Sequence, residues 1–484
     1  MKSPDTIIIR NHTRNGFRLK IAERLEPEIA LTAESSSLSV SSFATNFTAF
    51  LGNVTRSGAR PAPTLPSSPN KVDIHVREDV DLRIDPFASC NSNLRIDEHV
   101  LRLTLHGQGD EKWSLDISRE SIPSRSFIPL TKNAENHGFF ALFNGTSSVL
   151  ALFEDLHPQS WMKLCSDETA LSALSIPGTH NSPTCYTALP SVRCQAVSVI
   201  DQLRNGARFL DVRVQPARPM DPTDSTLNLV HGAFPISLTG PKRFDALLAE
   251  IENFLTSNPS ETVILSLKRE GTGDATDQQL ATMLHDHYTS GSKANLWYTE
   301  PRIPTLRQVR GKIVLFRRFA LPTNLKTKWH GRGWGLNAEN WKYNTTNSTS
   351  GDVCVQDLCE VLETVNIDTK IRVCCQHFER AAARPKVSDL VPGPLYLNFL
   401  SASYFWKVGC WPERIAVRVH PAVVAFLCER HRVGDGEVGK HTTQGDGGVG
   451  IVVCDWVGKG GDWDLVRCIL AMNSELLMKQ NARK

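Results

Sequence analysis

The feature of this sequence that most constrains its fold is a series of short apolar runs, each ending in polar, ionisable residues. The first ends in Ile176-Pro-Gly-Thr-His180-Asn-Ser, and Phe209–Arg213, Leu229–Gly232 and Val263–Glu270 follow in order. Helix-like stretches lie between most of these runs. Short buried strands that alternate with amphipathic helices are typical of βα units and of a largely parallel sheet.

Two of the intervening stretches are predicted to be helices. Lys242–Ser257 has apolar residues at helical spacing and stops before Asn258-Pro259, where proline cannot continue a helix. Cys194–Asn205 is predicted to end at Gly206, a residue suited to a C-terminal cap. Because polar residues collect at the strand ends, where the active site of a (β/α) barrel lies, we expect residues 151–484 to form an α/β domain with a TIM-type barrel, regular or irregular.

Residues 1–150 show a different pattern and are predicted to form a separate antiparallel β-sandwich-like domain. Segment 35–70 is rich in Ser, Pro and Gly and is expected to be a mobile insertion, and 433–450 is expected to be a flexible loop. The domain prediction rests on short β-like runs, several of which alternate apolar and polar residues: Thr6–Arg10, Phe17–Ala22, Val72–Arg77, Val80–Ile84, Val100–Leu105, Trp113–Ile117 and Phe139–Phe143.

Composition excludes several classes of protein. The net charge of +3 over 484 residues gives no nucleic-acid footprint and only weak attraction to anionic membranes. Met1–Arg10 lacks the apolar core of about 7–15 residues that a secretion signal needs, and no run approaches the roughly 18 apolar residues of a membrane span. The 12 cysteines include no C-x-x-C motif, which disfavours a zinc cluster and favours reduced thiols in the cytoplasm; a Cys354–Cys374 disulfide stays open.

From about Trp161 onward the chain resembles the phosphatidylinositol-specific phospholipases C through their catalytic X-type barrel. It is more similar to the bacterial single-domain enzymes than to the multidomain animal ones. The resemblance rests on an ordered set of motifs, each weak alone: Ile176–Ser182, Asp211-Val-Arg213, Val230-His231-Gly232, Asn258–Lys268, Arg310–Leu315, Val355-Gln-Asp357, Leu395–Phe399 and Val452–Asp455.

The resemblance implies an enzyme that cleaves phosphatidylinositol, or its glycosylated derivatives, to diacylglycerol and inositol 1,2-cyclic phosphate. Its partner would be membrane phospholipid at the bilayer surface, with no nucleic acid; the oligomeric state stays open. In this family the inositol 2-hydroxyl attacks its own phosphodiester, which requires a base and an acid. The resemblance assigns the base to His180, oriented by Asp455, the acid to His231, and charge stabilisation of the phosphate to Arg213.

Four further residues are assigned by resemblance to substrate binding: Lys268, Arg318, Asp357 and Asp211. Arg317 is adjacent to Arg318, and a one-residue shift of the alignment would exchange them. Arg269 and Glu270 are interpreted as ordinary charges at the rim, outside the site.

The residues also bear on metal use. Calcium needs several oxygen ligands, and calcium-dependent relatives present Asn after the first His and acidic residues where this chain has Arg213 and Lys268. Asn181 and Asp211 would suit calcium, but the two cations in the same cavity would repel it. We expect no cofactor and a metal-independent enzyme in which Arg213 replaces the ion, with calcium as the disfavoured alternative.

Two positions depart from the bacterial pattern. Asn181 stands where those enzymes carry Asp, and we expect it to position Arg213 by hydrogen bonding. Cys359 replaces an aromatic residue that would flank the inositol ring.

Two other functions stay open: a glycerophosphodiester phosphodiesterase, disfavoured because it needs a carboxylate-bound divalent ion, and a catalytically weak lipid- or glycan-binding module.

Aromatic residues are candidates for membrane contact. Tyr404, Phe405 and Trp406 follow the predicted strand Leu395–Ser401, so we expect them on an active-site loop, where aromatic rings favour the headgroup zone. A second candidate rim contains three tryptophans, Trp329, Trp334 and Trp341.

Overall fold

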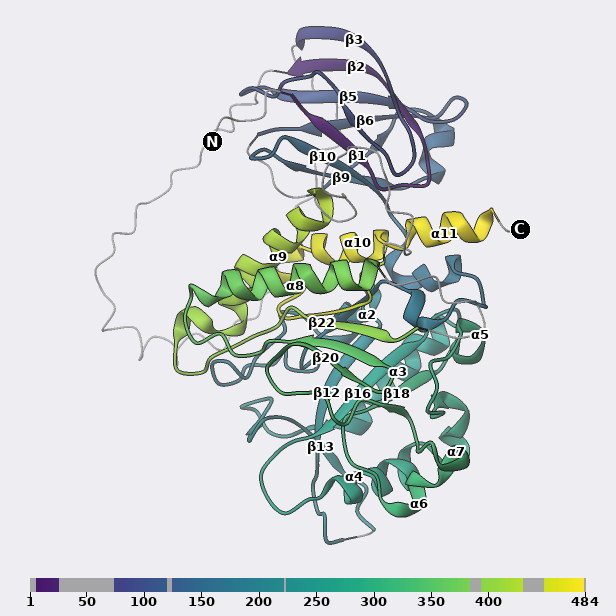
Figure 1. Ribbon diagram of the computed structural model, residues 1–484, viewed down its shortest axis with the longest axis vertical. Coiled ribbons are helices and arrows are strands. Elements are labelled where there is room, and N and C mark those ends of the chain that lie inside the picture. The colour runs from purple at the N-terminus through teal and green to yellow at the C-terminus, as the bar shows by residue number, and fades with distance from the viewer. Residues whose placement is uncertain are drawn as a thin grey trace.

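The computed structural model describes residues 6–25, 74–119, 124–221, 223–383, 393–429 and 448–482. A β-rich part lies above a larger α/β part (Figure 1). The predicted insertion 35–70, and residues 433–447 of the predicted loop, lie outside the described residues.

Two five-stranded sheets form the upper part. One has the order β4 (Ser89–Asn91), β1 (Ile8–Asn11), β10 (Val149–Glu154), β9 (Phe139–Asn144), β7 (Arg125–Ser126), and the other has the order β3 (Ile74–Ile84), β2 (Phe17–Leu25), β5 (Val100–His106), β6 (Lys112–Ile117), β8 (Ile128–Pro129). Phe17, Trp113 and Phe139 pack edge to face between the sheets, with ring centroids 5.1–5.9 Å apart.

One pairing in these sheets departs from the antiparallel prediction. β1 pairs in parallel with β10, while the other pairings are antiparallel. A parallel pair needs a long connection, and β1 and β10 are far apart in the sequence. β10 continues the sheet past residue 150.

The upper part packs against helices of the lower part. Phe140 and Phe153 belong to the same hydrophobic cluster as Ile469 of α10 (Asp464–Ala471). The Arg467 guanidinium lies 3.9 Å from the ring centroid of Phe140. Arg10 donates to the carbonyl of Cys428 at 2.9 Å, near the end of α9 (Pro412–Glu429). Apolar contact and hydrogen bonds therefore join the two parts.

The lower part is built on a large sheet. Its main order is β17 (Trp297–Tyr298), β18 (Ile313–Arg317), β16 (Val263–Arg269), β12 (Phe209–Pro216), β11 (Ile176–Thr179), β23 (Ile451–Cys454), β22 (Leu395–Phe399), β21 (Val353–Asp357), β20 (Thr345–Ser350). Neighbours from β17 to β21 are parallel, and β19 (Leu336–Asn337) pairs in parallel with β18. The α/β prediction is confirmed. In the part of the chain that the structure describes, no pairing joins β17 or β19 to β20, so closure into a barrel stays a prediction.

The strand that carries His231 is not parallel to its neighbours. β13 (Leu227–His231) pairs antiparallel with β12, β14 (Phe234–Pro235) and β15 (Lys242–Arg243). Only residues 217–226 connect β12 to β13, too few for a helical crossover, so the chain turns back. β13 is therefore an antiparallel exception in the largely parallel sheet that the sequence predicts.

The helices cover the sheet (Figure 1). Besides α9 and α10 they are α2 (Val199–Arg204), α3 (Phe244–Ser257), α4 (Asp277–Met283), α5 (Leu306–Val309), α6 (Thr323–Lys326), α7 (Lys328–Gly331), α8 (Asn366–Ala382) and α11 (Ser474–Asn481). α3 confirms the predicted helix. α2 begins later than predicted because Ser198 caps it, accepting from the Asp201 amide at 3.3 Å. Residues 194–198 are therefore not helical.

Residue alternation along the central strands separates two faces. Phe209, Ile264 and Phe316 belong to one hydrophobic cluster, whereas their neighbours Leu210, Leu265 and Leu315 belong to another that includes residues of α3 and α4. Because side chains along a strand alternate between faces, the residues that follow in step with the first set share its face: Asp211, Arg213, Lys268, Glu270 and Arg318.

A buried ion pair holds β12 and β16 where they begin. Arg208 Nη2 lies 2.8 Å from Glu261 Oε2, and both side chains are 0% exposed. The guanidinium also donates to the carbonyls of Leu203 and Gln159. Because both charges of this pair are buried, removing one residue leaves the charge of the other without its counterion.

We expect Glu261→Ala to lower the free energy of unfolding by about 3–5 kcal/mol, because it leaves the Arg208 charge buried without its counterion. Urea unfolding measures the loss. The control is Glu168→Ala, which breaks the exposed pair with Arg307 and should cost about 1 kcal/mol or less. Equal losses in the two variants would contradict this expectation.

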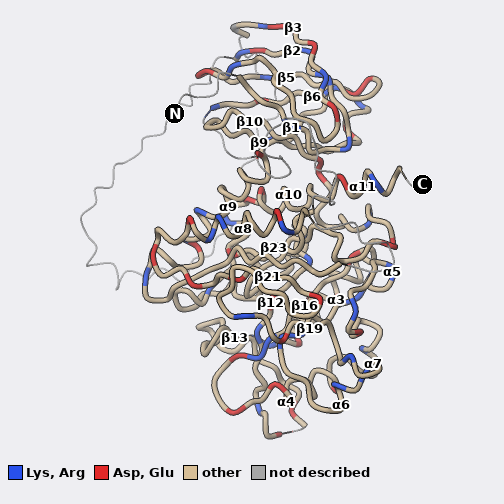
Figure 2. Tube along the Cα trace, viewed as in Figure 1, with Lys and Arg blue, Asp and Glu red and all other residues tan. Residues whose placement is uncertain are grey.

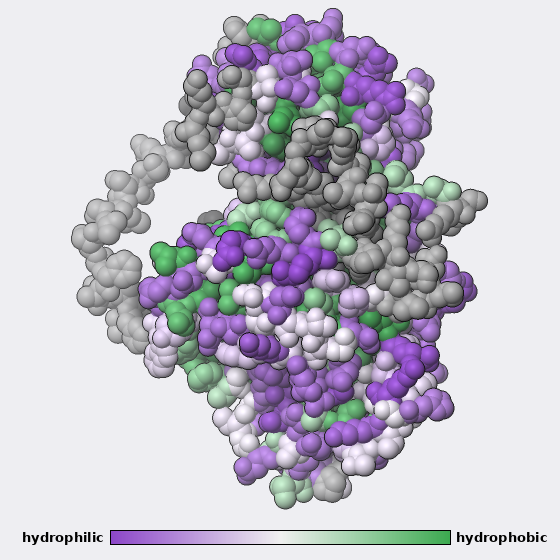
Figure 3. Space-filling view, in the orientation of Figure 1, coloured by the Kyte–Doolittle hydropathy of each residue, from purple (hydrophilic) through white to green (hydrophobic). Residues whose placement is uncertain are grey.

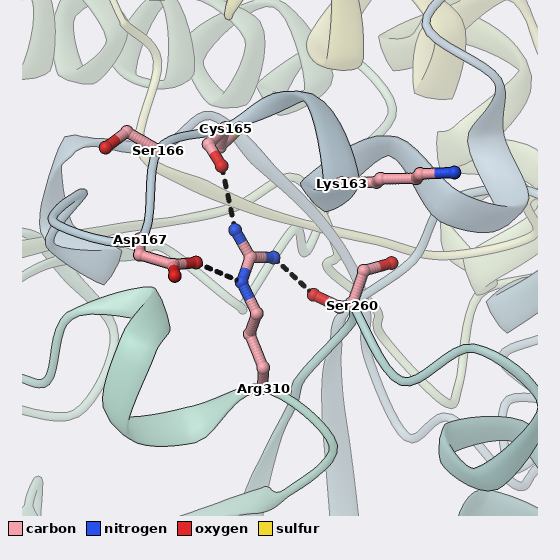
Figure 4. A pocket seen from close by; sticks show the side chains of 6 residues that line it. All are labelled: Lys163, Cys165, Ser166, Asp167, Ser260 and Arg310. Atoms are coloured by element: carbon pink, nitrogen blue, oxygen red, sulfur yellow. Dashed lines mark hydrogen bonds and ion pairs between the residues drawn. The ribbon is translucent and has the colours of Figure 1, made fainter.

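A pocket lies near the start of β16 and β18, the opposite strand ends from His180. It is lined by Lys163, Cys165, Ser166, Asp167, Ser260 and Arg310 (Figure 4). The Arg310 guanidinium is held by Asp167 at 2.6 Å and by the carbonyls of Cys165 and Ser260 at 2.7 and 2.6 Å. These bonds use the guanidinium to join loops of the fold, which is a structural role.

Among the described residues, no helix combines the length and the apolar composition that crossing a bilayer requires. The face shown in Figure 3 is largely hydrophilic, with hydrophobic patches at the left of the lower part.

Candidate active site

His180 directly follows β11 and pairs with Asp455, which directly follows β23. Nδ1 of His180 lies 2.8 Å from Oδ1 of Asp455, whose side chain is 3% exposed. Because a carboxylate only accepts, Nδ1 donates and Nε2 is left as the basic nitrogen. Burial lowers the pKa of His180, but the Asp455 charge outweighs it and holds that pKa well above its ordinary value.

β11 approaches β12 closely at Gly178. A Cβ at this residue would lie 2.8 Å from Cβ of Phe209, so glycine is needed two residues before His180. Asn181 then adopts the left-handed region, with φ of 43°. The close approach at Gly178 and the left-handed Asn181 turn the chain sharply after β11 and fix His180 at the end of this strand.

His231 faces His180 from the end of β13. Its Nδ1 donates to the carbonyl of Val192 at 2.8 Å, which leaves Nε2 available for proton transfer. The two imidazole rings lie 6.3 Å apart, between centroids, at an angle of 86°. Burial lowers the pKa of His231, but the neighbouring Cys194 thiol and the Val192 carbonyl raise it above its ordinary value.

Arg213 is held between two carboxylates. Its Nη2 lies 2.7 Å from Asp211, and its Nη1 pairs with Glu270. Asp211 also accepts from the Asn181 amide at 3.3 Å, and Glu270 accepts from the Gly232 amide at 2.8 Å. Arg213 is therefore tied to the segments that carry both histidines.

These charges shift one another's pKa values. Burial raises the pKa of Asp211 and of Glu270, but the Arg213 charge outweighs it, so that both carboxyls are held well below their ordinary range. Burial and the nearby Arg213 charge lower the pKa of Arg318 to about 10. Figure 2 shows basic and acidic residues gathered around β12, β13 and β16.

The residues assigned to substrate binding surround this centre. Lys268 Nζ lies 2.8 Å from Glu270, and Arg318 Nη1 lies 3.2 Å from Asp211. The Arg318 guanidinium stacks 3.7 Å from the ring centroid of Trp341, and Asp357 at the end of β21 is close enough to act on the pKa of Arg318. The structure thus brings together the assigned cations and acids.

Arg317 and Arg318 separate onto opposite faces of β18. Arg317 donates to the Trp334 carbonyl at 3.2 Å and pairs with Glu339 at 2.6 Å, away from the two histidines. Arg318 reaches Asp211. The geometry supports the choice of Arg318.

Glu270 is a correction to the sequence interpretation. It lies inside the site and bridges Arg213, Lys268 and the amide next to His231, whereas Arg269 points away and pairs with Asp277 at 2.7 Å. The two-residue period from Lys268 could have found Glu270, because it places both side chains on one face.

Asn181 also differs from expectation. Its Nδ2 lies 3.2 Å from Nε2 of His180 and 3.6 Å from Sγ of Cys194, and its Oδ1 is buried without a hydrogen-bond partner. The side chain therefore faces the histidine, not the guanidinium. The expectation that it holds Arg213 by its side chain is wrong, because Asp211 and Glu270 already occupy that cation.

Cys194 is a site residue that the sequence analysis missed. The late start of α2 leaves it in an extended segment, where its Sγ lies 4.0 Å from Nδ1 of His231. Burial raises the pKa of the Cys194 thiol, but the His231 charge and hydrogen bonds to His180 and His231 outweigh this and lower it to about 7. The helical interpretation of Cys194–Asn205 concealed this position. Cys354 and Cys374 are both unpaired thiols, so they do not form a disulfide with each other.

The aromatic loop after β22 is only partly exposed. Trp406 is 81% exposed and Phe405 stacks on Phe234, which follows β13, with centroids 6.4 Å apart. Tyr404 is partly buried and packs against the hydrophobic core, and its assignment to membrane contact stays a prediction. In the second candidate rim, Trp334 is buried and Trp341 lies beneath Arg318.

Two donor sets in this region could hold a cation. The oxygens of Asn181, Asp211 and Glu270 are of the kind that calcium takes, but both carboxylates are already paired with Arg213. The second set is His180, Cys194 and Asp455.

Residues 168–319 match the sequence model of one family, the X domain of phosphatidylinositol-specific phospholipase C. The matched segment carries both histidines, Arg213, Lys268 and Arg318, while Asp357 and Asp455 lie beyond it.

Two curated relatives have names that refer to the same phosphatidylinositol-cleaving activity as this family. The chain is 34% identical over 170 residues to a protein named 1-phosphatidylinositol phosphodiesterase from Listeria monocytogenes, a match that covers 32% of this chain and 48% of the relative. A relative of the same name from Staphylococcus aureus is 27% identical over 212 residues, which covers 41% of this chain and 64% of the relative. The match thus spans about half to two thirds of these relatives' length.

The fold is also similar to a solved structure. A crystal structure of phosphatidylinositol-specific phospholipase C from S. aureus, containing pentafluoro-Phe, superposes with a TM-score of 0.51 at 21% identity. The superposition covers 66% of this chain and 99% of that one. The similarity concerns the fold.

Proposed function

We propose that this protein is a metal-independent phospholipase C. It would cleave phosphatidylinositol, or its glycosylated derivatives, to diacylglycerol and inositol 1,2-cyclic phosphate. The observation that carries the proposal is the pair of facing histidines, each with Nδ1 committed to an acceptor. The two Nε2 atoms are then the nitrogens for proton transfer, and that of His180 lies 3.2 Å from Nδ2 of Asn181. Cyclisation needs one base and one acid at the same phosphorus.

The geometry supports a division of labour between the histidines. His180, with Asp455 behind it, would take the proton of the inositol 2-hydroxyl at Nε2. His231, whose Nδ1 is held by the Val192 carbonyl, would give a proton to the glycerol oxygen. Arg213 would stabilise the charge that develops on the nonbridging phosphate oxygens, while Lys268, Arg318 and Asp357 would bind the inositol hydroxyls.

The pairing of charges supports the proposal of metal independence. A divalent cation at Asp211 and Glu270 would have to displace the Arg213 guanidinium, which contacts both carboxylates, and two like charges a few ångströms apart repel strongly at low dielectric. The same pairing disfavours a glycerophosphodiester phosphodiesterase that needs a carboxylate-bound ion.

We propose that Phe234, Phe405 and Trp406 form an aromatic rim that meets the bilayer. Phe234 is three residues from His231 in sequence, and it stacks on Phe405. Aromatic rings of this kind favour the headgroup region. The free thiols suit a reducing compartment, so we propose a cytoplasmic protein that binds membranes peripherally.

Phosphorus NMR of phosphatidylinositol vesicles mixed with the purified protein and a chelator tests the proposal. We expect the phosphodiester signal to be replaced by that of inositol 1,2-cyclic phosphate, because the attacking hydroxyl belongs to the substrate. Phosphatidic acid formed by hydrolysis on the inositol side of the phosphorus, with no cyclic phosphate, would favour the phosphodiesterase alternative. Vesicle binding without turnover would favour the lipid-binding module.

A further inference from the structure

Cys194 shares a compact cluster with the proposed base and its carboxylate. One ligand atom from each of His180, Cys194 and Asp455 lies within 4.8 Å of the other two. The cysteine is fixed on both sides, because its amide donates to Thr184 at 3.0 Å and its carbonyl accepts from the Trp456 amide at 2.8 Å. The thiol is therefore held in place beside the imidazole.

Two neighbours complete the surroundings of the sulfur. His231 lies beside the sulfur, with Nδ1 4.0 Å from Sγ, but this nitrogen donates to the Val192 carbonyl and is not a ligand atom. The side-chain amide of Asn181 also faces the sulfur, with Nδ2 3.6 Å from Sγ. Asn181 is 1% exposed, and its Oδ1 is buried without a hydrogen-bond partner. The buried Oδ1 is an unpaired acceptor on the same side chain whose Nδ2 contacts the sulfur and the imidazole.

The donor set selects the class of ligand. Thiolate sulfur, imidazole nitrogen and one carboxylate oxygen together suit Zn²⁺ and similar thiophilic divalent ions, whereas calcium and magnesium prefer oxygen alone. Zinc binds sulfur at about 2.3 Å and nitrogen at about 2.0–2.1 Å, so donors that share one ion lie roughly 3–4 Å apart. The cluster needs only a small contraction to reach that spacing.

We propose that His180, Cys194 and Asp455 form an inhibitory site for Zn²⁺ or a similar thiophilic divalent ion. The ion would replace the thiol proton, which is released to solvent, and would occupy the imidazole that turnover needs as a base. It would therefore act opposite to an activating metal, and a chelator would restore activity. The inhibition rests on the proposed function, whereas the binding does not.

Direct binding is tested with the full chain, first treated with chelator and reductant and then titrated with Co²⁺. We expect a thiolate-to-cobalt charge-transfer band that saturates at one equivalent and is displaced by Zn²⁺. Cys194→Ser should lose the band and bind Zn²⁺ weaker by about tenfold or more, because it loses the sulfur ligand. Cys185→Ser is the matched control, since this nearby thiol lies outside the cluster, and should keep both.

His180→Ala provides a second variant if Cys194→Ser does not fold, and it should also weaken Zn²⁺ binding while the thiol remains. Wild-type protein without a one-equivalent band, or a band unchanged in either variant, would overturn the site. A separate assay follows cleavage of phosphatidylinositol vesicles with Zn²⁺ and then with chelator. Absence of cleavage without metal would refute the proposed function but leave the cobalt titration to decide on binding.

Discussion

His180→Ala and His231→Ala should each lower turnover of phosphatidylinositol by about 10²–10⁴-fold, because each removes one partner of a proton transfer. The two imidazoles face one another, and each Nδ1 is engaged elsewhere, so neither ring can take over the role of the other. Initial rates on phosphatidylinositol vesicles measure the loss. The far-UV spectrum and the thermal midpoint should stay close to those of the wild type.

His137→Ala is the matched control for these variants. His137 lies in the upper part, pairs with Glu111 and has a side chain that is 48% exposed, so the variant should keep wild-type turnover. Activity within about tenfold of the wild type in His180→Ala or His231→Ala would remove that histidine from the mechanism.

Strand alternation explains how far the sequence alone could define the site. The apolar runs predict β11, β12 and β16, and the two-residue period within them places Asp211 with Arg213 and Lys268 with Glu270. The same period separates Arg317 from Arg318. Interpreting Glu270 as an ordinary rim charge overlooks its two-residue step from Lys268, which places both side chains on one face.

Other parts of the site depend on contacts that no local pattern encodes. β13 looks like a strand of the parallel sheet, and only the short connection 217–226 indicates that it turns back. The position of Cys194 depends on where α2 begins, which the Ser198 cap decides. Asn181 faces His180 and not Arg213, because the Arg213 guanidinium is paired with the carboxylates of Asp211 and Glu270.

Arg213→Lys should lower turnover by about 10²–10³-fold, although it keeps the positive charge. Arg213 uses Nε and Nη2 on Asp211 and Nη1 on Glu270, which requires the planar fork of a guanidinium. An ammonium group is a point charge on a flexible stem and cannot hold both carboxylates in this way. Asp211 and Glu270 would then no longer be fixed beside the segments that carry the two histidines.

The matched control is Arg269→Lys, which changes an arginine that pairs with Asp277 on the other face of β16 and should keep wild-type turnover. Rates measured with chelator and with added calcium distinguish a site in which Arg213 replaces a metal ion from a site that binds calcium. If Arg213 does the work of an ion, the chelator leaves wild-type turnover intact or raises it, and calcium does not rescue Arg213→Lys. Calcium stimulation of the wild type, together with an Arg213→Lys variant of near-normal activity, would instead mean that Asn181, Asp211 and Glu270 bind a metal and that the guanidinium only neutralises them between turnovers.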